Sequence, residues 1–247
     1  MNLLIVDRLQ KSFGGVRALD GVSFGLDARD LAALIGPNGA GKSTLFNLID
    51  GQLAPDAGTV KYDGQPIAAL ATAERTRRGI GRTFQVAQIF GTMTALQNAQ
   101  LAIAASRGEE QRIGAPLWNL HVQAARSLLS QVGLEAHAST AAAELAYGDS
   151  KRLELALALA GRPRLLLMDE PTAGMAPAER TVLMQLVASL ARERSMAVLF
   201  TEHSMDVVFG FARRVLVMSQ GRLIADGAPD AVRVDPEVQR VYLGAET

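Results

Sequence analysis

The chain has 247 residues, enough for one sizeable domain or two small ones. Lysine plus arginine and aspartate plus glutamate number 25 each, and this zero net charge argues against a general electrostatic grip on nucleic acid. Cysteine is absent, which excludes disulfides, thiolate nucleophiles and cysteine-ligated metals.

The first thirty residues contain short strand-like pieces. These pieces include residues 3–6 and 22–24, and a turn at Gly14 and Gly15 separates them. The apolar patch at the N-terminus is too short for a signal peptide, and no apolar run approaches the length of a membrane span. We therefore expect any role at a membrane to be carried out from the cytoplasmic surface, through a partner.

A phosphate-binding motif follows. Residues 36–44 match the pattern G-x-x-x-x-G-K-[ST] at every fixed position, between a strand-like run at 31–35 and a helix-like run at 45–49. Glycines let backbone N–H groups turn toward an anion, and a helix N-terminus adds its positive dipole end. We expect Lys42 to reach the β- and γ-phosphates and the Ser43 hydroxyl to ligate Mg²⁺. The alternative, a glycine-rich turn that opens an ordinary helix, is disfavoured by the complete match.

The rest of the chain alternates between helix-like and strand-like segments. Residues 93–146 are rich in alanine and leucine at helical spacing, which predicts a helical subdomain inserted into a core. Short apolar runs at 165–168, 197–200 and 215–218 are typical of strands buried on both faces of a parallel sheet. Because helical stretches separate them, the pattern predicts a doubly wound α/β core.

Two acids follow the first of these apolar runs. Ligands gather at the carboxyl ends of strands in an open α/β sheet. There, Asp169 can hold Mg²⁺, and Glu170 can orient or deprotonate a water for in-line attack on a γ-phosphate. Pro171 leaves a simpler interpretation, in which the acids only cap a turn, but the phosphate-binding motif favours catalysis.

Residues 145–149, Leu-Ala-Tyr-Gly-Asp, complete a set that resembles the ATP-binding cassette (ABC) ATPases, whose signature loop usually reads Leu-Ser-Gly-Gly-Gln. In that family this loop binds the γ-phosphate of ATP held by a second subunit. Ala146 here lacks the serine hydroxyl, Tyr147 replaces a glycine, and Asp149, a good helix cap, replaces the glutamine. Ala176 lies where the family carries Asp or Asn in a loop that communicates between subunits. The resemblance implies a modified signature that still binds through its backbone.

The resemblance assigns further roles to single residues. Phe13 lies at the position of an aromatic that stacks on adenine. Gln85 matches a glutamine that touches Mg²⁺ and links the site to the helical subdomain. His203 matches the switch histidine that contacts the γ-phosphate. The other two histidines, His121 and His137, are expected to have surface or packing roles.

The resemblance covers nearly the whole chain and implies its fold. That fold is α/β: a P-loop NTPase (RecA-like) core with a mixed sheet, an N-terminal antiparallel β subdomain and an inserted α-helical subdomain. We expect a single ABC ATPase domain over residues 1–247. Its expected parts are a nucleotide-binding core at 1–92 and 147–230, a helical subdomain at 93–146 and a C-terminal tail at 231–247.

Two segments narrow the resemblance to a subgroup. Residues 78–85 and 236–244 look like the ATPase subunits of branched-chain amino acid importers, although lipopolysaccharide-export ATPases end similarly. We therefore expect an ATP- and Mg²⁺-dependent subunit that powers import of branched-chain amino acids or a related small solute. The alternatives are an exporter ATPase of the lipopolysaccharide type, a soluble non-transport ABC ATPase and a small-molecule kinase.

The subgroup also implies partners and a site. The partners are a second ATPase subunit, identical or related, separate transmembrane permease subunits and, indirectly, a substrate-binding protein, at the cytoplasmic face of the inner membrane. The predicted catalytic residues are Glu170, His203, Gln85 and Lys42, and the predicted Mg²⁺ ligands are Ser43, Gln85 and Asp169. The predicted ATP-binding residues are Phe13, Gly36, Pro37, Asn38, Gly39, Ala40, Gly41, Lys42, Ser43, Thr44, Ala146, Tyr147, Gly148 and Asp149.

Overall fold

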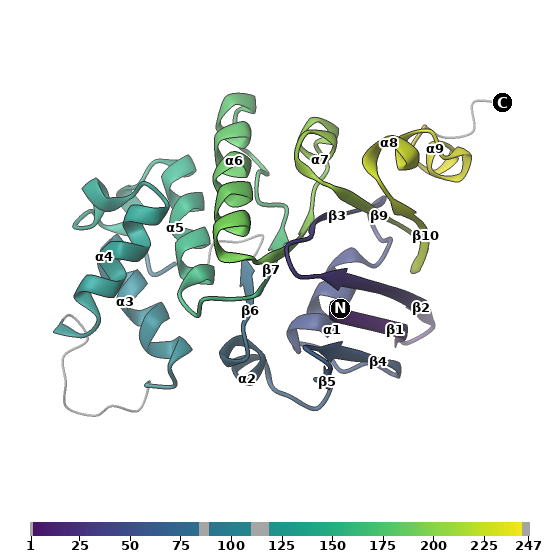
Figure 1. The fold of residues 1–247 in the computed structure, drawn as a ribbon, viewed down its shortest axis with the longest axis horizontal. Helices are drawn as coiled ribbons and strands as arrows, with labels where there is room; N and C mark the ends of the chain where they lie inside the picture. The colour runs from purple at the N-terminus through teal and green to yellow at the C-terminus, as the bar shows by residue number, and fades with distance from the viewer. Residues whose placement is uncertain (1, 84–88, 110–118, 244–247) are drawn as a thin grey trace.

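A computed structural model describes residues 2–83, 89–109 and 119–243 (Figure 1). Gln85, a predicted catalytic residue and Mg²⁺ ligand, lies outside the described residues. Two sheets and a set of helices make up the molecule, with the antiparallel sheet at the lower right of Figure 1 and α6 to α9 along the top.

The N-terminal sheet is antiparallel. It has four strands in the order β2-β1-β4-β5, namely β1 (Asn2–Phe13), β2 (Val16–Asp27), β4 (Ala57–Tyr62) and β5 (Gln65–Pro66). The short strands expected at 3–6 and 22–24 are therefore wrong in length. Strands β1 and β2 stay paired through polar, exposed positions, with several shifts in register. Polar side chains are tolerated there because only one face of the sheet is buried.

The central sheet is mixed, as predicted. It has six strands in the order β10-β9-β3-β8-β7-β6, and all neighbours are parallel except β10 and β9. The strands are β3 (Leu31–Ile35), β6 (Ile80–Thr83), β7 (Leu165–Asp169), β8 (Ala197–Thr201), β9 (Arg214–Ser219) and β10 (Arg222–Gly227).

Two hydrophobic cores lie on opposite faces of this sheet. Along β3, Leu31, Ala33 and Ile35 pack into one core, whereas Ala32 and Leu34 pack into the other. Successive side chains of a strand point to opposite faces, so a strand between two cores must be apolar throughout. The same alternation explains the continuous apolar runs of β7 and β8.

Helix α1 (Lys42–Asp50) lies in the core shared by the two sheets. Its C-terminus is held by Arg75, a fully buried side chain on α2 (Thr72–Arg77). The Arg75 guanidinium donates hydrogen bonds of 2.7–3.0 Å to four backbone carbonyls, those of Leu48, Ile49, Ala68 and Leu70. Helix ends leave carbonyls unpaired, and Arg75 satisfies two of them at the end of α1.

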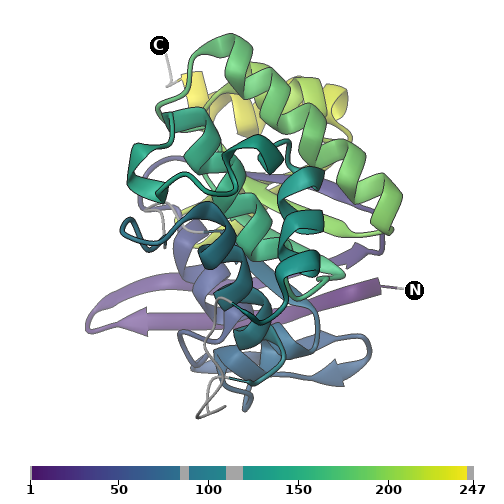
Figure 2. The ribbon, with the colours of Figure 1, turned by 90° about the vertical axis from the view of Figure 1, so that its left-hand side faces the viewer.

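The other core is covered by helices. At one end of the molecule lie α3 (Ala95–Ser106), α4 (Val122–Gln131) and α5 (Tyr147–Leu159), the teal to green group that faces the viewer in Figure 2. Helices α6 (Pro177–Arg194), α7 (Met205–Phe211), α8 (Pro229–Arg233) and α9 (Pro236–Leu243) follow along the sheet. Among the described residues, none of these helices has the length and apolar character needed to cross a bilayer.

Candidate active site

A pocket of about 530 Å³ opens where β3 ends and α1 begins. Most of its wall is the predicted phosphate-binding loop, and the rest comes from the start of β2, the end of β7 and the turn after β9. The lining residues are Val16, Arg17, Ala18, Asn38, Gly39, Ala40, Gly41, Lys42, Ser43, Thr44, Glu170 and Gln220. The fold therefore brings the loop and Glu170, more than a hundred residues apart in the chain, into one cavity.

The loop takes a backbone conformation that requires glycine. Gly39 and Gly41 have φ angles of 80° and 101°, in a region where side chains are strained. A Cβ atom on Gly41 would lie 2.5 Å from the carbonyl oxygen of Ala18. Gly41 lets the chain enter α1 in close contact with β2, so that the N-terminus of the helix forms the base of the pocket.

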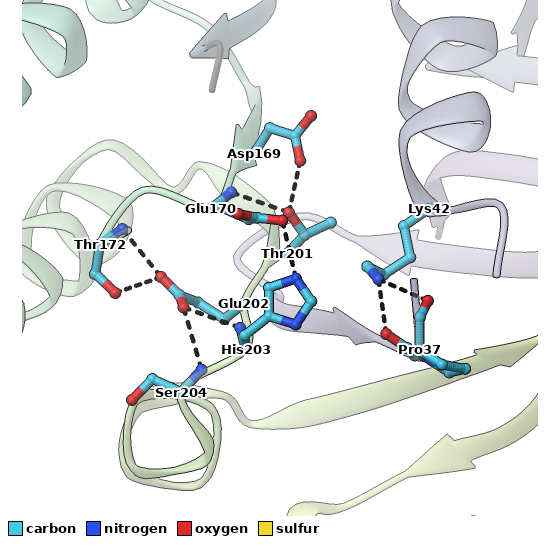
Figure 3. Close-up of polar contacts among 10 residues, drawn as sticks. Pro37, Lys42, Asp169, Glu170, Thr172, Thr201, Glu202, His203 and Ser204 are labelled. Carbon is cyan, nitrogen blue, oxygen red and sulfur yellow. Dashed lines mark hydrogen bonds and ion pairs between the residues drawn. The ribbon is translucent and has the colours of Figure 1, made fainter. Parts of the chain in front are cut away.

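Lys42 is held over the loop. Its Nζ donates to the carbonyl oxygens of Gly36 at 2.7 Å and Pro37 at 3.1 Å, and the residue is buried. Burial lowers the pKa of Lys42, and the charges of Glu170 and Asp169 oppose that shift. Figure 3 shows this ammonium on the side of the site opposite the acids, where a cation can neutralise phosphate charge between them.

The two acids at the end of β7 are fixed by one hydroxyl. Thr201, at the end of β8, donates to Oδ1 of Asp169 at 2.8 Å and accepts from the backbone N–H of Glu170 at 3.0 Å. Glu170 has a φ of 49°, a left-handed conformation that costs a non-glycine residue about 1–3 kcal/mol. The bond from Thr201 helps to hold this conformation. Thr201 is not among the predicted site residues, because its only signal in the sequence is its place at the end of an apolar strand.

The donor set of the site suits magnesium. Oδ2 of Asp169 lies 3.7 Å from the Arg82 guanidinium, which also pairs with Asp50 at 3.1 Å. Ser43, an exposed hydroxyl in the first turn of α1, lines the pocket. Carboxylate and hydroxyl oxygens are the hard ligands that Mg²⁺ prefers, and Mg²⁺ is usually bound by one or two of them together with substrate phosphates. In the part of the chain that is described, no cluster of three or more His, Cys, Asp or Glu side chains could hold a metal.

Glu170 faces a histidine. Its Oε1 lies 2.9 Å from Nε2 of His203, the residue two positions beyond the end of β8 (Figure 3). The His203 side chain is half exposed and the Glu170 side chain is 21% exposed, so water and ligand can reach both. A carboxylate in hydrogen-bond reach of an imidazole, at the edge of a phosphate pocket, can take a proton from an attacking water.

Phe13 lies beside the pocket. It is the last residue of β1 and pairs in register with Val16, which lines the pocket. Phe13 is 47% exposed, and the Lys11 ammonium lies 5.6 Å from the centre of its ring. Three further lining residues, Val16, Arg17 and Gln220, are not among the predicted ones, because no local pattern connects them to the loop.

The signature segment, residues 145–149, lies outside the pocket of the phosphate-binding loop. Ala146, Gly148 and Asp149 line a separate pocket of about 240 Å³, together with Met175 and Glu179 among others. Within one chain, therefore, the signature segment and the phosphate-binding loop do not share a cavity.

Helix α5 begins at Tyr147, which places Asp149 in its first turn. Asp149 is not the helix cap. Ala146 occupies the cap position without a side-chain bond, while Asp149 sits in the first turn, 3.7 Å from Arg152. The reason is that the helix begins three residues earlier than a cap at Asp149 would require.

Tyr147 ties the signature segment to the loop after β7. Its hydroxyl donates to the carbonyl of Ala173 at 2.7 Å. The next residue, Gly174, has a φ of 77°, and a Cβ atom there would lie 3.0 Å from the Tyr147 oxygen. Ala176, which ends this loop, donates its backbone N–H to Glu179 at 3.1 Å. The tyrosine that replaces a signature glycine thus has a structural partner that the sequence pattern did not reveal.

Comparison with known proteins gives consistent matches. A family model described as "ABC transporter" matches residues 19–173, and one described as "Branched-chain amino acid ATP-binding cassette transporter" matches residues 222–247. The chain is 37% identical to the high-affinity branched-chain amino acid transport ATP-binding protein BraF of Pseudomonas aeruginosa, over 98% of each chain. It is 35% identical to LivG of Escherichia coli K12, which carries the same description, over 98% of each chain.

Other matches extend the comparison. The lipopolysaccharide export system ATP-binding protein LptB of Escherichia coli K12 is 34% identical, over 100% of this chain and 99% of its own. Among solved structures, the ADP conformation of MJ1267, an ATP-binding cassette of an ABC transporter, has a TM-score of 0.87 at 33% identity and covers 99% of both chains. The dimeric post-hydrolysis state of the cassette MJ0796, bound to ADP and Pi, has a TM-score of 0.78 at 26% identity, over 92% of this chain and 98% of that one.

Proposed function

The chain belongs to the ATP-binding subunits of ABC transporters, and we propose that it hydrolyses ATP to power the import of branched-chain amino acids through separate permease subunits. One observation carries the catalytic part of the proposal. The phosphate-binding loop and Glu170 line the same pocket, and Glu170 is held against His203.

In this proposal each residue has a role in hydrolysis. Lys42 exchanges its bonds to the carbonyls of Gly36 and Pro37 for bonds to phosphate oxygens. Glu170 accepts a proton from the attacking water, and His203 donates toward the γ-phosphate. Phe13 supports the adenine through its exposed ring. These assignments rest on position in the pocket and on side-chain chemistry.

Magnesium would be held by Ser43 and Asp169. When bound, the ion neutralises charge on the β- and γ-phosphates. Thr201 orients the Asp169 carboxylate through Oδ1 and leaves Oδ2 toward Arg82. Gln85 stays a proposed third ligand.

A second ATPase subunit would complete the site. The signature segment lines its own pocket, away from the phosphate-binding loop of the same chain. The backbone N–H groups at the start of α5 and its dipole can bind the γ-phosphate of ATP on a facing subunit. We propose a closed dimer with two such composite sites, identical or formed with a related chain.

We propose that residues 93–146 form a helical subdomain. The permease would dock in a groove between this subdomain and the core. A cavity of about 320 Å³ lies there, mostly apolar, between α2, β6, α3 and α5. Arg82 and Asp50 line its floor, and the same Arg82 contacts Asp169. A permease segment in this groove would thus lie one residue away from a proposed Mg²⁺ ligand, at the cytoplasmic face of the membrane.

Branched-chain amino acids are favoured as the transported solute over lipopolysaccharide. The C-terminal segment 222–247 matches the branched-chain model, and BraF and LivG match over nearly their whole length. The identity to LptB, 34%, is only slightly lower, so an exporter is the second candidate.

The transport proposal is tested by purification and uptake. The tagged chain is isolated from its native membranes and the proteins that accompany it are identified, while uptake of radiolabelled leucine is measured in cells that lack the chain. We expect permease subunits in the preparation, and uptake restored by the wild type but not by Glu170→Gln. Partners of the lipopolysaccharide-export type, with leucine uptake unchanged, would refute the import proposal.

A further inference from the structure

The Glu202 side chain lies between two loops and contacts both. One loop follows β7 and carries Glu170, and the other follows β8 and carries His203. Glu202 follows Thr201 at the end of β8, and its side chain is almost completely buried, with the residue 4% exposed. Glu202 is therefore not available to substrate or water. Its role must be exercised through the groups that it binds.

Each carboxylate oxygen of Glu202 accepts from one of the two loops. Oε1 accepts from the backbone N–H of Thr172 at 3.0 Å and from the Thr172 hydroxyl. Oε2 accepts from the backbone N–H groups of His203 at 3.1 Å and Ser204 at 3.4 Å. Figure 3 shows the carboxylate between the loop that carries Glu170 and the loop that carries His203.

We propose that Glu202 is a positioning residue that sets the His203 imidazole against the Glu170 carboxylate, an inference that rests on the catalytic site of the proposed function. The bond between His203 and Glu170 is 2.9 Å long but partly exposed, and a hydrogen bond at an exposed site contributes little free energy by itself. The buried carboxylate fixes the backbone on both sides of that bond. Hydrogen bonds to a charged group are the stronger ones, and four donors converge on this one.

Replacing Glu202 by glutamine distinguishes its bonds to Thr172 from its bonds to His203 and Ser204. In Glu202→Gln the amide oxygen can still accept from Thr172, but the amide NH₂ cannot accept from His203 and Ser204. We expect the two loops to lose their relative placement while the phosphate-binding loop keeps its shape. ATP affinity should then change less than threefold, whereas kcat falls roughly 10- to 100-fold, because a misplaced histidine removes only part of the roughly 100- to 10,000-fold contribution of general acid–base catalysis.

Imidazole signals supply a readout that does not depend on activity. The chain has only three histidines, so His203 can be followed by ¹⁵N NMR with His121 and His137 as internal controls. In Glu202→Gln we expect the ¹⁵N signals of His203 to move toward those of a free imidazole, with the other two unchanged. Unchanged His203 signals, or equal movement of all three, would overturn the proposal.

Thr172→Val keeps the test decisive if Glu202→Gln folds poorly, and a double variant tests whether Glu202 acts through His203. Thr172→Val removes one donor of the four and should shift the His203 signals in the same direction by a smaller amount. In a His203→Ala background, Glu202→Gln should lower the single-turnover rate less than twofold, because residues that act through one another are not additive. A full 10-fold further loss would show that Glu202 acts independently of His203. Since the NMR result needs neither permease nor dimer, its failure is distinct from a failure of the transport proposal.

Discussion

Asp169 and Thr201 lie opposite each other in the parallel pairing of β7 and β8, and the Thr201 hydroxyl bridges them by donating to Asp169 Oδ1 at 2.8 Å. Glu170 follows the first residue directly, and His203 comes two positions after the second. Register therefore places Glu170, the proposed base, beside His203 at the carboxyl ends of the two strands, where their side chains meet at 2.9 Å. The chemistry of the site depends on this register as much as on residue identity.

Lys42→Ala should weaken ATP binding roughly 10- to 150-fold, because a charge-assisted hydrogen bond to phosphate is worth about 1.5–3 kcal/mol. Isothermal titration with ATP and Mg²⁺ measures the loss. Lys61→Ala is a matched control, since Lys61 is exposed on β4 outside the pocket. An affinity equal to that of the wild type would refute the role given to Lys42.

Tyr147→Phe should weaken the ATP-dependent dimer a few-fold and lower the free energy of unfolding of the monomer by at most about 1.5 kcal/mol. The variant removes only the bond to the Ala173 carbonyl, worth about 0.5–1.5 kcal/mol, and keeps the exposed ring. The effect is measured by sedimentation of the Glu170→Gln protein with ATP, with and without the second substitution. Equal dimer affinities would mean that the link between the signature segment and the loop after β7 does not affect closure.

Arg75→Met should lower the free energy of unfolding by roughly 2–4 kcal/mol. It leaves four carbonyls without their donor, those of Leu48 and Ile49 at the end of α1 among them. Arg78→Met on the same turn is the control, because its exposed ion pair with Glu74 contributes at most about 1 kcal/mol. Urea unfolding separates the two, and equal midpoints would contradict this account of how α1 is held.

Stability should fall with rising pH between about 10 and 12 because of Tyr62. Burial raises the pKa of Tyr62 from 10.0 to about 12, and its hydroxyl donates to the Gly79 carbonyl at 2.9 Å. In that window the folded chain holds a proton that the unfolded chain has lost, so the contribution is full below pH 10 and lost above 12. The loss amounts to at most about 2–3 kcal/mol.

Tyr62→Phe checks this assignment. Chemical denaturation at pH 9 and pH 11.5 should show a smaller drop in the variant than in the wild type. At neutral pH the variant should be about 1 kcal/mol less stable, because it lacks the hydrogen bond to Gly79. An identical pH dependence in both proteins would assign the effect to other groups.

Local signals made much of the fold predictable. The motif at 36–44 specifies a turn and a helix start through glycines and a lysine, and apolar runs such as 165–168 and 197–200 specify strands buried on both faces. Both signals consist of residues that are consecutive in the chain. The mixed sheet predicted from the resemblance to ABC ATPases is confirmed by the order and direction of its strands.

The contacts that shape the site could not be predicted in the same way, because they join residues far apart in the chain. Tyr147 bonds to Ala173, Glu202 to Thr172 and Thr201 to Asp169, and no local pattern encodes such pairs. The length of β1 and β2 was missed for a related reason. Their polar positions look like loop until the pairing partner is known.

The central claim is that Glu170 is the general base of an ATPase, and one measurement tests it most directly. Steady-state release of phosphate from Mg·ATP is compared for the wild type and Glu170→Gln, with ATP binding measured on the same samples. We predict that the variant binds ATP as the wild type does and loses roughly 100- to 10,000-fold in turnover, since the amide cannot take the proton from water. Turnover within a few-fold of the wild type would contradict the account.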